Sequence, residues 1–322
     1  MITLTKIAKL SHVSVSTVSK AFSMSNEVNE KTRELIFEVA RENNCFREYF
    51  NAKYPKYVIA IVCPEFYSTY YSSTLSLIQS NLERYNCEIT VASTNFSEDT
   101  ERELIEYYSN YTTVDAIINY GTITAKDIRT DIPIINMSKS SDNKNYICHN
   151  FDEALNNAIG YFIKSGISKI GFISEKKTIK KLDAFCKTMN SNSFAIDYNH
   201  IVITEKRFED GGYSGMEEIF KRGNIPDAII CGYDDMAIGA MRCIFDHGLK
   251  VPEDILVMGM NDISVSSYVE PPLSSISLKN ELTCRAATDM LMARLNGTEF
   301  PDSVEVQCEL ILRKSTNRKL NS

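Results

Sequence analysis

The sequence lacks the short motifs that carry most enzymatic and metal-binding chemistry. No GxSxG, P-loop, HExxH or GxGxxG motif follows a strand-like segment, and the nine cysteines include no CxxC pair. The glycine cluster GGYSG has the wrong order for a turn that carries a catalytic serine, and it is more typical of a helix beginning near Gly212. The histidines are dispersed and have no evident acidic partner: His12, His149, His200 and His247. We therefore expect no enzyme activity, no metal site and no cofactor.

Long apolar runs and paired cysteine patterns are also missing. No segment approaches the ~20 apolar residues that are needed to span a bilayer. The N-terminus has no apolar stretch preceded by basic residues, as a signal peptide would have. An odd number of scattered cysteines is typical of reduced thiols rather than of a disulfide framework. The sequence therefore predicts a cytoplasmic protein that makes no contact with a membrane.

The sequence does contain enough apolar residues for a large core, on an acidic background. Apolar residues make up 43% of its 322 residues and the formal charge is −7, which is far from a disordered composition. At roughly 100–200 residues per domain, this length predicts two or three compact units. Between Met1 and Met24 the charged side chains are Lys6, Lys9 and Lys20, so the acidic excess lies in the rest of the chain. A small basic head on an acidic body suits a protein that offers only its head to phosphates.

Three short amphipathic helices are predicted in the first fifty residues. Thr3 or Thr5 can cap the first helix, and Ser14 is placed to cap a second helix over Val15–Phe22. Asn29 can cap a third helix after a looser segment. The predicted buried face of the third helix consists of Leu35, Ile36, Val39 and Ala40. Short helices with a tight turn between the first two form a helix-turn-helix layout.

The second of these helices has the side-chain chemistry of a DNA reader. Its exposed positions carry hydroxyls and a lysine, which can bind phosphates and base edges, and it contains no carboxylate that would repel the DNA backbone. These positions are Ser14, Ser16, Thr17, Ser19 and Lys20. The same pattern also fits the solvent-facing side of an ordinary three-helix bundle.

The segment LTKIAKLSHVSVSTVSKA, Leu4–Ala21, closely resembles the DNA-binding head of the LacI/GalR repressor family, T-L-x-D-[IV]-A-x-x-A-G-V-S-x-x-T-V-S-R. The following segment VNEKTR resembles the opening of that family's third helix. By position, the resemblance implies base contacts from Val15, Ser16 and Lys20. It implies phosphate contacts from Thr3, Ser14, Thr17 and Ser19.

Several positions depart from the family pattern. Lys20 replaces an arginine and loses the two-pronged donor that reads guanine well. His12 stands where a turn glycine is usual, which costs strain where the backbone φ is positive. The family's hinge segment, Y-x-P-N-x-x-A-R-x-L, is largely altered, and Tyr54 takes the place of the leucine that wedges into the minor groove. We retain Tyr54 as a candidate DNA contact, although Pro55 behind it limits any longer helix.

From Tyr57 onward, strand-like apolar runs alternate with helical patterns in two consecutive series. Such alternation predicts parallel sheets with helices on both faces. The predicted fold class is therefore a small all-α helix-turn-helix domain followed by an α/β core of two doubly wound subdomains. Ligands of such sheets bind beyond the carboxyl ends of the strands.

The core also resembles the same family, through PDAIIC (Pro226–Cys231), DMAIGA (Asp235–Ala240), VPEDI and PPLSSI. The resemblance implies a fold like that of periplasmic sugar-binding proteins, with three chain crossings between the subdomains. The expected units are a DNA-binding domain at 1–48, a hinge at 49–57 and an effector-binding core at 58–322. Within the core we expect a first subdomain at 58–165 and 280–309, and a second at 166–279 and 310–322. No leucine-heptad tail follows, so we expect a homodimer rather than a tetramer.

The resemblance further implies a small-molecule pocket in the core. A polar small molecule needs groups that bind hydroxyls and an aromatic wall. The candidate effector-binding residues, by family position, are Tyr70, Tyr71, Asn150, Lys181, Phe208, Tyr233 and Asn261. Lys181, Tyr233 and Asn261 replace arginine, asparagine and aspartate, which predicts an effector with some flat or apolar character, such as an oligosaccharide, glycoside or nucleoside. Packing of Tyr233 at the subdomain interface is a nearly equal alternative to ligand contact.

Together these features predict a sequence-specific DNA-binding transcription regulator, with repression as the family default. Its dimer is expected to bind a roughly palindromic double-stranded operator, with an affinity controlled by a small polar effector. The alternative is a cytosolic ligand sensor whose DNA binding is weak or depends on a partner. A pure ligand-binding protein of the periplasmic type is disfavoured by the helix-turn-helix and by the missing signal peptide.

Overall fold

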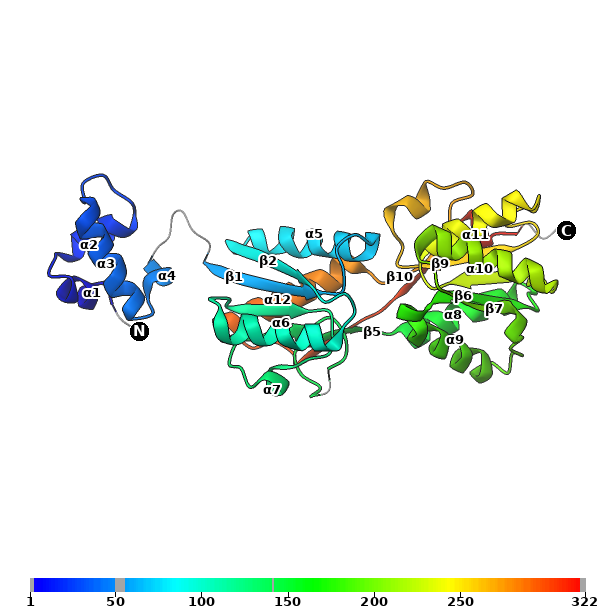
Figure 1. The fold of residues 1–322 in the computed structure, drawn as a ribbon, viewed down its shortest axis with the longest axis horizontal. Helices are drawn as coiled ribbons and strands as arrows, with labels where there is room; N and C mark the ends of the chain where they lie inside the picture. The colour runs from blue at the N-terminus through cyan, green and yellow to red at the C-terminus, as the bar shows by residue number, and fades with distance from the viewer. Residues whose placement is uncertain (1–2, 50–55, 141, 319–322) are drawn as a thin grey trace.

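The computed structural model describes residues 3–49, 56–140 and 142–318 of the chain. Figure 1 shows a helical head and two α/β bodies. Tyr54, a predicted DNA contact, lies outside the described residues. Among the helices that are described, none combines the length and the apolar composition that a membrane crossing requires.

The head begins with the three helices that the sequence predicts. Its elements are α1 (Leu4–Leu10), α2 (Val15–Phe22), α3 (Glu30–Glu42) and the single turn α4 (Phe46–Tyr49). The Ser14 hydroxyl accepts a hydrogen bond from the Thr17 backbone N–H at 3.0 Å, and the Asn29 carboxamide accepts one from Thr32 at 2.9 Å. Both side chains therefore cap their helices as expected. His12 adopts a φ of 55°, so the turn holds a non-glycine residue in the left-handed region.

Aromatic packing sets the face of α3 that is buried in the head. The ring of Phe37 lies 5.4 Å from that of Phe22 and 5.0 Å from that of Phe46, centroid to centroid. Leu35, which the apolar pattern predicts to be buried, is 44% exposed, and Phe37 takes the place expected for it. A phenylalanine at this site fills the space between α2 and α4 because its ring reaches two aromatic neighbours at once.

The core contains two parallel β-sheets. The first has the strand order β11-β5-β4-β3-β1-β2, and all its neighbouring strands are parallel. Its strands are β1 (Tyr57–Cys63), β2 (Cys87–Ser93), β3 (Ala116–Asn119), β4 (Ile134–Asn136), β5 (Tyr146–His149) and β11 (Ser303–Val306). The second has the order β12-β10-β9-β8-β6-β7, with only β12 antiparallel to its neighbour. Its strands are β6 (Ile170–Glu175), β7 (Ile201–Thr204), β8 (Ala228–Cys231), β9 (Leu256–Met260), β10 (Ser274–Ser277) and β12 (Glu309–Ile311).

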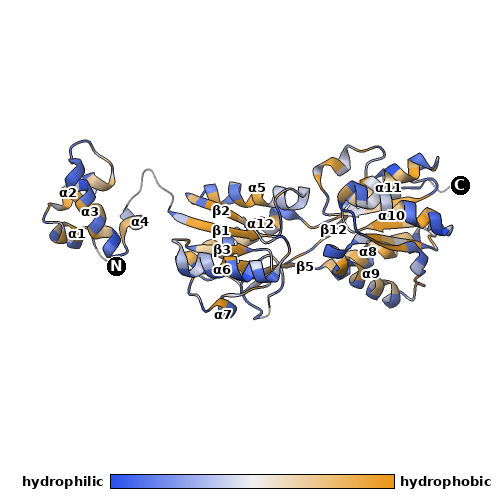
Figure 2. Cartoon of the chain, in the orientation of Figure 1, coloured by the Kyte–Doolittle hydropathy of each residue, from blue (hydrophilic) through white to orange (hydrophobic). Residues whose placement is uncertain are grey.

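Helices cover both faces of each sheet. The first sheet packs against α5 (Thr69–Glu83) and α12 (Asn280–Asn296) on one side, and against α6 (Glu98–Tyr111) and α7 (Ala125–Ile128) on the other. The second sheet packs against α8 (Phe151–Lys164) and α9 (Ile179–Ser191), and against α10 (Phe208–Arg222) and α11 (Asp234–Asp246). Figure 2 shows the apolar strands enclosed between helices whose outer faces are hydrophilic. Two doubly wound subdomains follow from these layers, as the sequence predicts.

The described chain passes between the two sheets after β5, after β10 and after β11. This agrees with the three crossings that the family resemblance implies. The first crossing, however, lies earlier than the expected boundary at residue 165. Leu155 and Phe162 of α8 belong to the buried cluster that contains Phe172 of β6, so α8 is part of the second subdomain. Helical periodicity does not show which of two sheets a helix covers, which explains the difference.

Glycines let α10 and α11 pack backbone against backbone. A Cβ on Gly212 would lie 1.8 Å from the carbonyl oxygen of Met236, and one on Gly239 would lie 1.9 Å from that of Glu209. The glycine cluster therefore lies inside a helix that begins at Phe208, not at its expected start at Gly212. Its role is close approach of two helices rather than initiation of one.

We predict that Gly212→Ala destabilises the core, although alanine ordinarily favours a helix interior over glycine by about 1 kcal/mol. The added methyl group must displace the α11 backbone, and overpacking of this kind costs about 1–3 kcal/mol. Urea unfolding should show a lower midpoint for this variant. Gly160→Ala in α8 is the matched control, because no atom lies within 4 Å of its added Cβ, and it should leave the midpoint unchanged or raise it. Equal shifts for both variants would contradict the packing argument.

Candidate functional site

The predicted DNA-binding side chains lie together on the surface of the head. Val15 is 42% exposed although it is apolar, while Val18 and Phe22 of the same helix are buried. Thr3 is exposed at the start of α1, and Ser14, Ser16 and Ser19 are exposed on α2, with Thr17 and Lys20 half-buried. An α-helix that presents hydroxyls, one apolar contact and a cation fits the major groove of DNA.

Two of these hydroxyls already take part in the cap of α2. The Ser14 oxygen lies 2.8 Å from the Thr17 hydroxyl, in addition to the hydrogen bond from the Thr17 backbone. A phosphate at this end of α2 would meet hydroxyls that the cap holds in place, together with the N–H groups of the first turn. Capping and phosphate contact are therefore compatible at Ser14.

Lys20 is paired with Glu27 from the segment after α2. The Lys20 side chain is about half exposed and the Glu27 side chain more so, which leaves the pair accessible to solvent. Glu27 lies outside α2, so the absence of carboxylates within that helix does not reveal this partner. A DNA phosphate or a base edge has to compete with Glu27 for Lys20.

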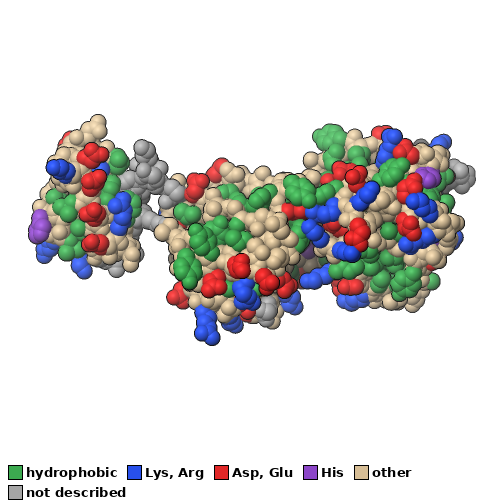
Figure 3. Space-filling view, viewed as in Figure 1, with side chains coloured by type: hydrophobic (Ala, Val, Ile, Leu, Met, Phe, Trp, Pro, Cys, Tyr) green, Lys and Arg blue, Asp and Glu red, His purple; other side chains and the backbone are tan. Residues whose placement is uncertain are grey.

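Acidic side chains lie on a different face of the head. The exposed glutamates of α3 recur at every fourth residue: Glu30, Glu34, Glu38 and Glu42. Figure 3 shows a column of acidic side chains along the head. Like charges spaced four apart on a helix repel one another and cost a few tenths of a kcal/mol per pair. This stripe is unsuited to contact with phosphates, so α1 and α2 are the side of the head that can face DNA.

A cavity of about 200 Å³ lies between the two subdomains. Its lining includes the predicted residues Tyr70, Tyr71, Lys181, Phe208, Tyr233 and Asn261. Asn150 does not line it. The Asn150 carboxamide instead accepts a hydrogen bond from the Glu153 backbone at 3.3 Å and caps α8. Residues of the lining that the sequence analysis missed are Glu65, Ser68, Phe96, Glu175, Lys177, Thr178, Arg207, Asp235 and Leu278.

An ionic triad crosses this cleft. Two terminal nitrogens of Arg207, in the second subdomain, donate to both carboxylate oxygens of Glu65, in the first subdomain, at 2.6 and 2.8 Å. The Arg207 Nε lies 3.0 and 2.9 Å from the two oxygens of Glu175, the last residue of β6. Both carboxylates are buried. Figure 3 shows acidic and basic side chains gathered where the two α/β bodies meet.

Glu65 and Arg207 keep their charges in spite of burial. Burial alone would raise the pKa of Glu65, but the hydrogen bonds and the charge of Arg207 outweigh it, and the pKa is lowered. The hydrogen bonds that Arg207 donates to Glu65 and Glu175 raise the pKa of Arg207. Paired charges therefore join the two sides of the cleft, and desolvation makes them costly to separate without a substitute partner.

Aromatic rings form the apolar wall of the cavity. The Arg207 guanidinium lies 4.5 Å from the centroid of Phe208 and 5.4 Å from that of Phe96, and the Lys177 ammonium lies 4.2 Å from that of Phe96. Phe96, Phe208 and Asn261 all adopt positive φ, at 63°, 52° and 93°. Backbone strain of this kind costs about 1–3 kcal/mol per residue and is concentrated at functional sites. Its recurrence in the lining supports a binding role for this cavity.

Tyr233 combines the two roles that the sequence analysis left open. Its ring lines the cavity, while its hydroxyl oxygen accepts a hydrogen bond from the Phe208 backbone at 2.9 Å and lies 3.3 Å from Glu175. The side chain is 6% exposed. Tyr233 therefore fixes the position of Phe208 and offers only part of its ring to a ligand.

The ammonium group of Lys181 is buried, and few interactions offset the cost of removing its charge from water. Burial lowers its pKa to about 8, against the opposing charges of Asp234 and Glu175. Its Nζ donates to the carbonyl oxygen of Gly232 at 2.6 Å. The Asp234 carboxylate is itself used elsewhere, because it accepts hydrogen bonds from Ser275 at 2.6 Å and from the Ile263 backbone at 2.8 Å. Lys181 thus remains available as a donor to a ligand in the cavity.

We predict that Lys181→Met stabilises the protein near neutral pH. The pKa of this lysine falls from 10.5 to about 8 on folding, so its charged form costs folding free energy below pH 8, and the cost fades as pH rises toward 10.5. A shift of this size outweighs the roughly 1 kcal/mol of the one hydrogen bond that is lost.

Thermal unfolding across this pH range measures the effect of Lys181→Met. The stabilisation should be largest at and below pH 8 and should shrink above it. Lys180→Met, at an exposed neighbouring position, is the control and should show no such profile. A destabilised Lys181→Met variant at pH 7 would show that the ammonium group is well paired in the folded protein.

Comparisons with known proteins agree with this architecture. A family model for bacterial regulatory proteins of the lacI family matches residues 3–46, and one for a periplasmic binding protein-like domain matches residues 159–316. The probable HTH-type transcriptional repressor ExuR of Bacillus subtilis (strain 168) is 27% identical, over 99% of both chains. The HTH-type transcriptional repressor PurR of Pasteurella multocida (strain Pm70) is also 27% identical, over 99% of this chain and 100% of its own.

Solved structures show the same fold. The lac repressor dimer bound to operator and the anti-inducer ONPF superposes with a TM-score of 0.73 at 21% identity, over 98% of this chain and 99% of that one. A complex of the transcriptional regulator CelR with cellobiose gives a TM-score of 0.69 at 21% identity, over 98% and 100%. This chain therefore combines a lacI-family DNA-binding head with a periplasmic-binding-protein-like core, the domain composition of the LacI-family repressors to which it is similar.

Proposed function

We propose that this protein is a repressor that binds a roughly palindromic operator as a homodimer, with an operator affinity controlled by a small polar effector in the cleft. The observation that carries this proposal is the cavity between the subdomains, where charged and aromatic side chains from both meet. A ligand at such a boundary can bind one arrangement of the subdomains better than another. This differential affinity is what effector control of DNA binding requires.

The ionic triad supports a specific mechanism of control. Glu65 and Arg207 belong to different subdomains, so an effector that takes hydrogen bonds from either group changes the contact between them. Hydroxyl groups of the effector replace part of the bidentate pair, and the subdomains shift to a new arrangement. The head is joined to the first subdomain just before β1, so this shift alters the spacing of the two heads in a dimer.

The lining favours an effector of the sugar, glycoside or nucleoside class. Carboxylates, a guanidinium and an ammonium bind hydroxyl groups, while Phe96, Phe208 and Tyr71 offer aromatic faces to an apolar ring surface. A cavity of about 200 Å³ is smaller than the ~300–1,000 Å³ of most ligand pockets. Binding of a glycoside therefore requires the Glu65–Arg207 contact to part. The cellobiose in the CelR structure, which has a similar fold, is a ligand of this class.

A second candidate function, a ligand sensor with weak DNA binding, is favoured by one observation. Lys20, the cation at a predicted base-reading position of α2, forms an ion pair with Glu27. If this pair persists on DNA, the head loses a base contact and retains mainly hydroxyl contacts. Operator binding then depends on a partner or on a second signal.

We predict that wild-type protein prefers one operator from a pool of palindromic duplexes, and that Lys20→Ala and Ser16→Ala lose this preference. Loss of a base contact typically costs about 1–3 kcal/mol of discrimination. Fluorescence anisotropy on selected and random duplexes measures it. Weak binding by wild-type protein that is indifferent to sequence would instead favour the sensor.

The same titrations test the Lys20–Glu27 pair. Glu27→Gln frees Lys20 and removes a negative charge near the DNA, so it should bind all duplexes a few-fold more tightly, with a steeper salt dependence. Glu38→Gln on the acidic stripe of α3 is the control. It removes the same charge from a residue that is not paired with Lys20, so it should change DNA binding little. Identical effects of the two variants would mean that only net charge matters.

We predict that Phe208→Leu weakens effector binding about tenfold and leaves effector-free operator affinity unchanged. An aromatic contact contributes about 0.5–1.5 kcal/mol beyond area burial, and 1.4 kcal/mol corresponds to a factor of ten. A calorimetric screen of sugars, glycosides and nucleosides on wild-type protein supplies the effector. Phe245→Ala, a partly exposed phenylalanine outside the cavity lining, is the control and should retain affinity. Unchanged affinity in Phe208→Leu would remove Phe208 from the effector site.

A further inference from the structure

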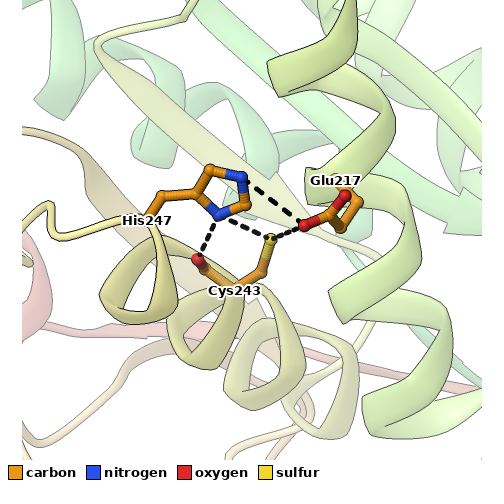
Figure 4. A group of neighbouring side chains, drawn as sticks. All are labelled: Glu217, Cys243 and His247. Atoms are coloured by element: carbon orange, nitrogen blue, oxygen red, sulfur yellow. Dashed lines mark hydrogen bonds and ion pairs between the residues drawn. The ribbon is translucent and has the colours of Figure 1, made fainter.

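A cluster of side chains that could bind a metal ion lies in the C-terminal halves of α10 and α11, away from the cleft. Figure 4 shows Glu217 of α10 facing Cys243 of α11 and His247, the C-cap residue just after α11. One donor atom from each of the three lies within 4.8 Å of the other two. The cavity lining does not include any of these residues. Along α11, about eight residues at 1.5 Å per residue, roughly 12 Å, separate Asp235 of the cavity from Cys243.

The distances between donor atoms are close to those around a tetrahedral ion. The Cys243 sulfur lies 3.9 Å from the Glu217 Oε1, and the His247 Nε2 lies 3.5 Å from the same oxygen. Zinc bonds of about 2.3 Å to sulfur and 2.0–2.1 Å to nitrogen or oxygen place tetrahedral ligands roughly 3.3–3.7 Å apart. The two distances to the Glu217 oxygen therefore need to shorten by only a few tenths of an ångström.

The histidine is oriented for binding through Nε2. Its Nδ1 lies 2.9 Å from the Cys243 carbonyl oxygen, so the proton on Nδ1 is donated to the backbone and the Nε2 lone pair points toward Glu217. Histidine ligands of metals commonly donate their other ring N–H in this way. The ring also stacks on Phe220, with centroids 4.2 Å apart, which fixes its plane.

The carboxylate and the thiol complete the donor set. Glu217 directs one oxygen at the cluster, while its other oxygen lies 3.8 Å from the exposed Lys221 ammonium. The thiol of Cys243 is buried, and burial raises its pKa to about 12. A bound divalent cation supplies the positive charge that lets this thiol lose its proton. His247 and Glu217 are solvent-accessible, so an ion can enter from that side.

We propose that Glu217, Cys243 and His247 bind one Zn²⁺ per chain, with a water molecule in the fourth position. Thiolate, imidazole and carboxylate together are the donors that Zn²⁺ accepts in tetrahedral sites, whereas Mg²⁺ and Ca²⁺ require oxygen ligands. Binding releases the Cys243 thiol proton to solvent. The ion joins α10 to α11, the two helices whose first turns contribute Phe208 and Asp235 to the cavity lining, so it braces the second-subdomain wall of the pocket. A simple ion pair between His247 and Glu217 is the competing explanation for their approach.

Metal titrations of the metal-free, full-length protein test this proposal. Calorimetry with Zn²⁺ alone should show one site per chain, with heats that depend on the ionisation enthalpy of the buffer because one proton is released. Titration with Co²⁺ should produce the thiolate charge-transfer absorption and the visible bands of a tetrahedral cobalt centre. Neither signal would arise from a His247–Glu217 ion pair, and absence of both overturns the proposal.

Variants assign the site and separate it from adventitious binding. His247→Gln changes an exposed side chain and should fold normally, so it should weaken Zn²⁺ at least about tenfold, the loss seen even for an outer-shell partner of a ligand. Cys243→Ala should abolish the cobalt charge-transfer band. Cys186→Ser, on α9 outside the cluster, is the matched control and should keep the band and the affinity. Zn²⁺ should raise the melting temperature of wild type and Cys186→Ser but not of His247→Gln. Retention of the cobalt band by both His247→Gln and Cys243→Ala would place the ion elsewhere and overturn the assignment.

Discussion

The cleft depends on the guanidinium of Arg207 lying between the buried carboxylates of Glu65 and Glu175. Removing such ions from water costs several kcal/mol each, and the bidentate hydrogen bonds recover that cost only in one geometry. The buried apolar clusters of the described core each stay within a single subdomain. Each subdomain is therefore held together by its own core, while polar contacts decide how the two meet. A polar ligand can compete for such contacts, as it could not for a continuous apolar interface.

The pocket residues owe their positions to the layers behind them. Glu175 ends β6, Phe208 begins α10 and Asp235 lies in the first turn of α11, so the edge of one parallel sheet delivers several groups to the cleft. The strained φ of Phe208 and Asn261 turns these side chains away from the regular course of their elements. Rigid sheets and helices provide the free energy that offsets this strain. The head follows the opposite plan, since its contact groups project from the outside of α2 and need no cavity.

Local sequence signals predicted the capped helices and the alternation of strands and helices, while the family resemblance located six of the residues that line the cavity. Ser14 and Asn29 were recognisable because a cap needs only its own helix. Arg207 and Glu65 were missed because their importance arises from a contact across 142 residues of sequence that no local pattern encodes. Their only sequence signal is a position just beyond a strand that belongs to a parallel sheet. Assignment of α8 to the wrong subdomain has the same cause, since an amphipathic face does not identify the sheet that it covers.

The backbone contact between α10 and α11 also constrains how this pocket can change. Because the Gly212 and Gly239 sites leave no room for a side chain, the two helices move as one body. Phe208 and Tyr233, at their leading ends, therefore keep a constant separation whatever the subdomains do. New ligand preferences cannot evolve by sliding one helix past the other. They have to come from exchange of side chains on this fixed wall, or from the loop that carries Phe96 on the opposite subdomain, which makes that loop the adaptable half of the pocket.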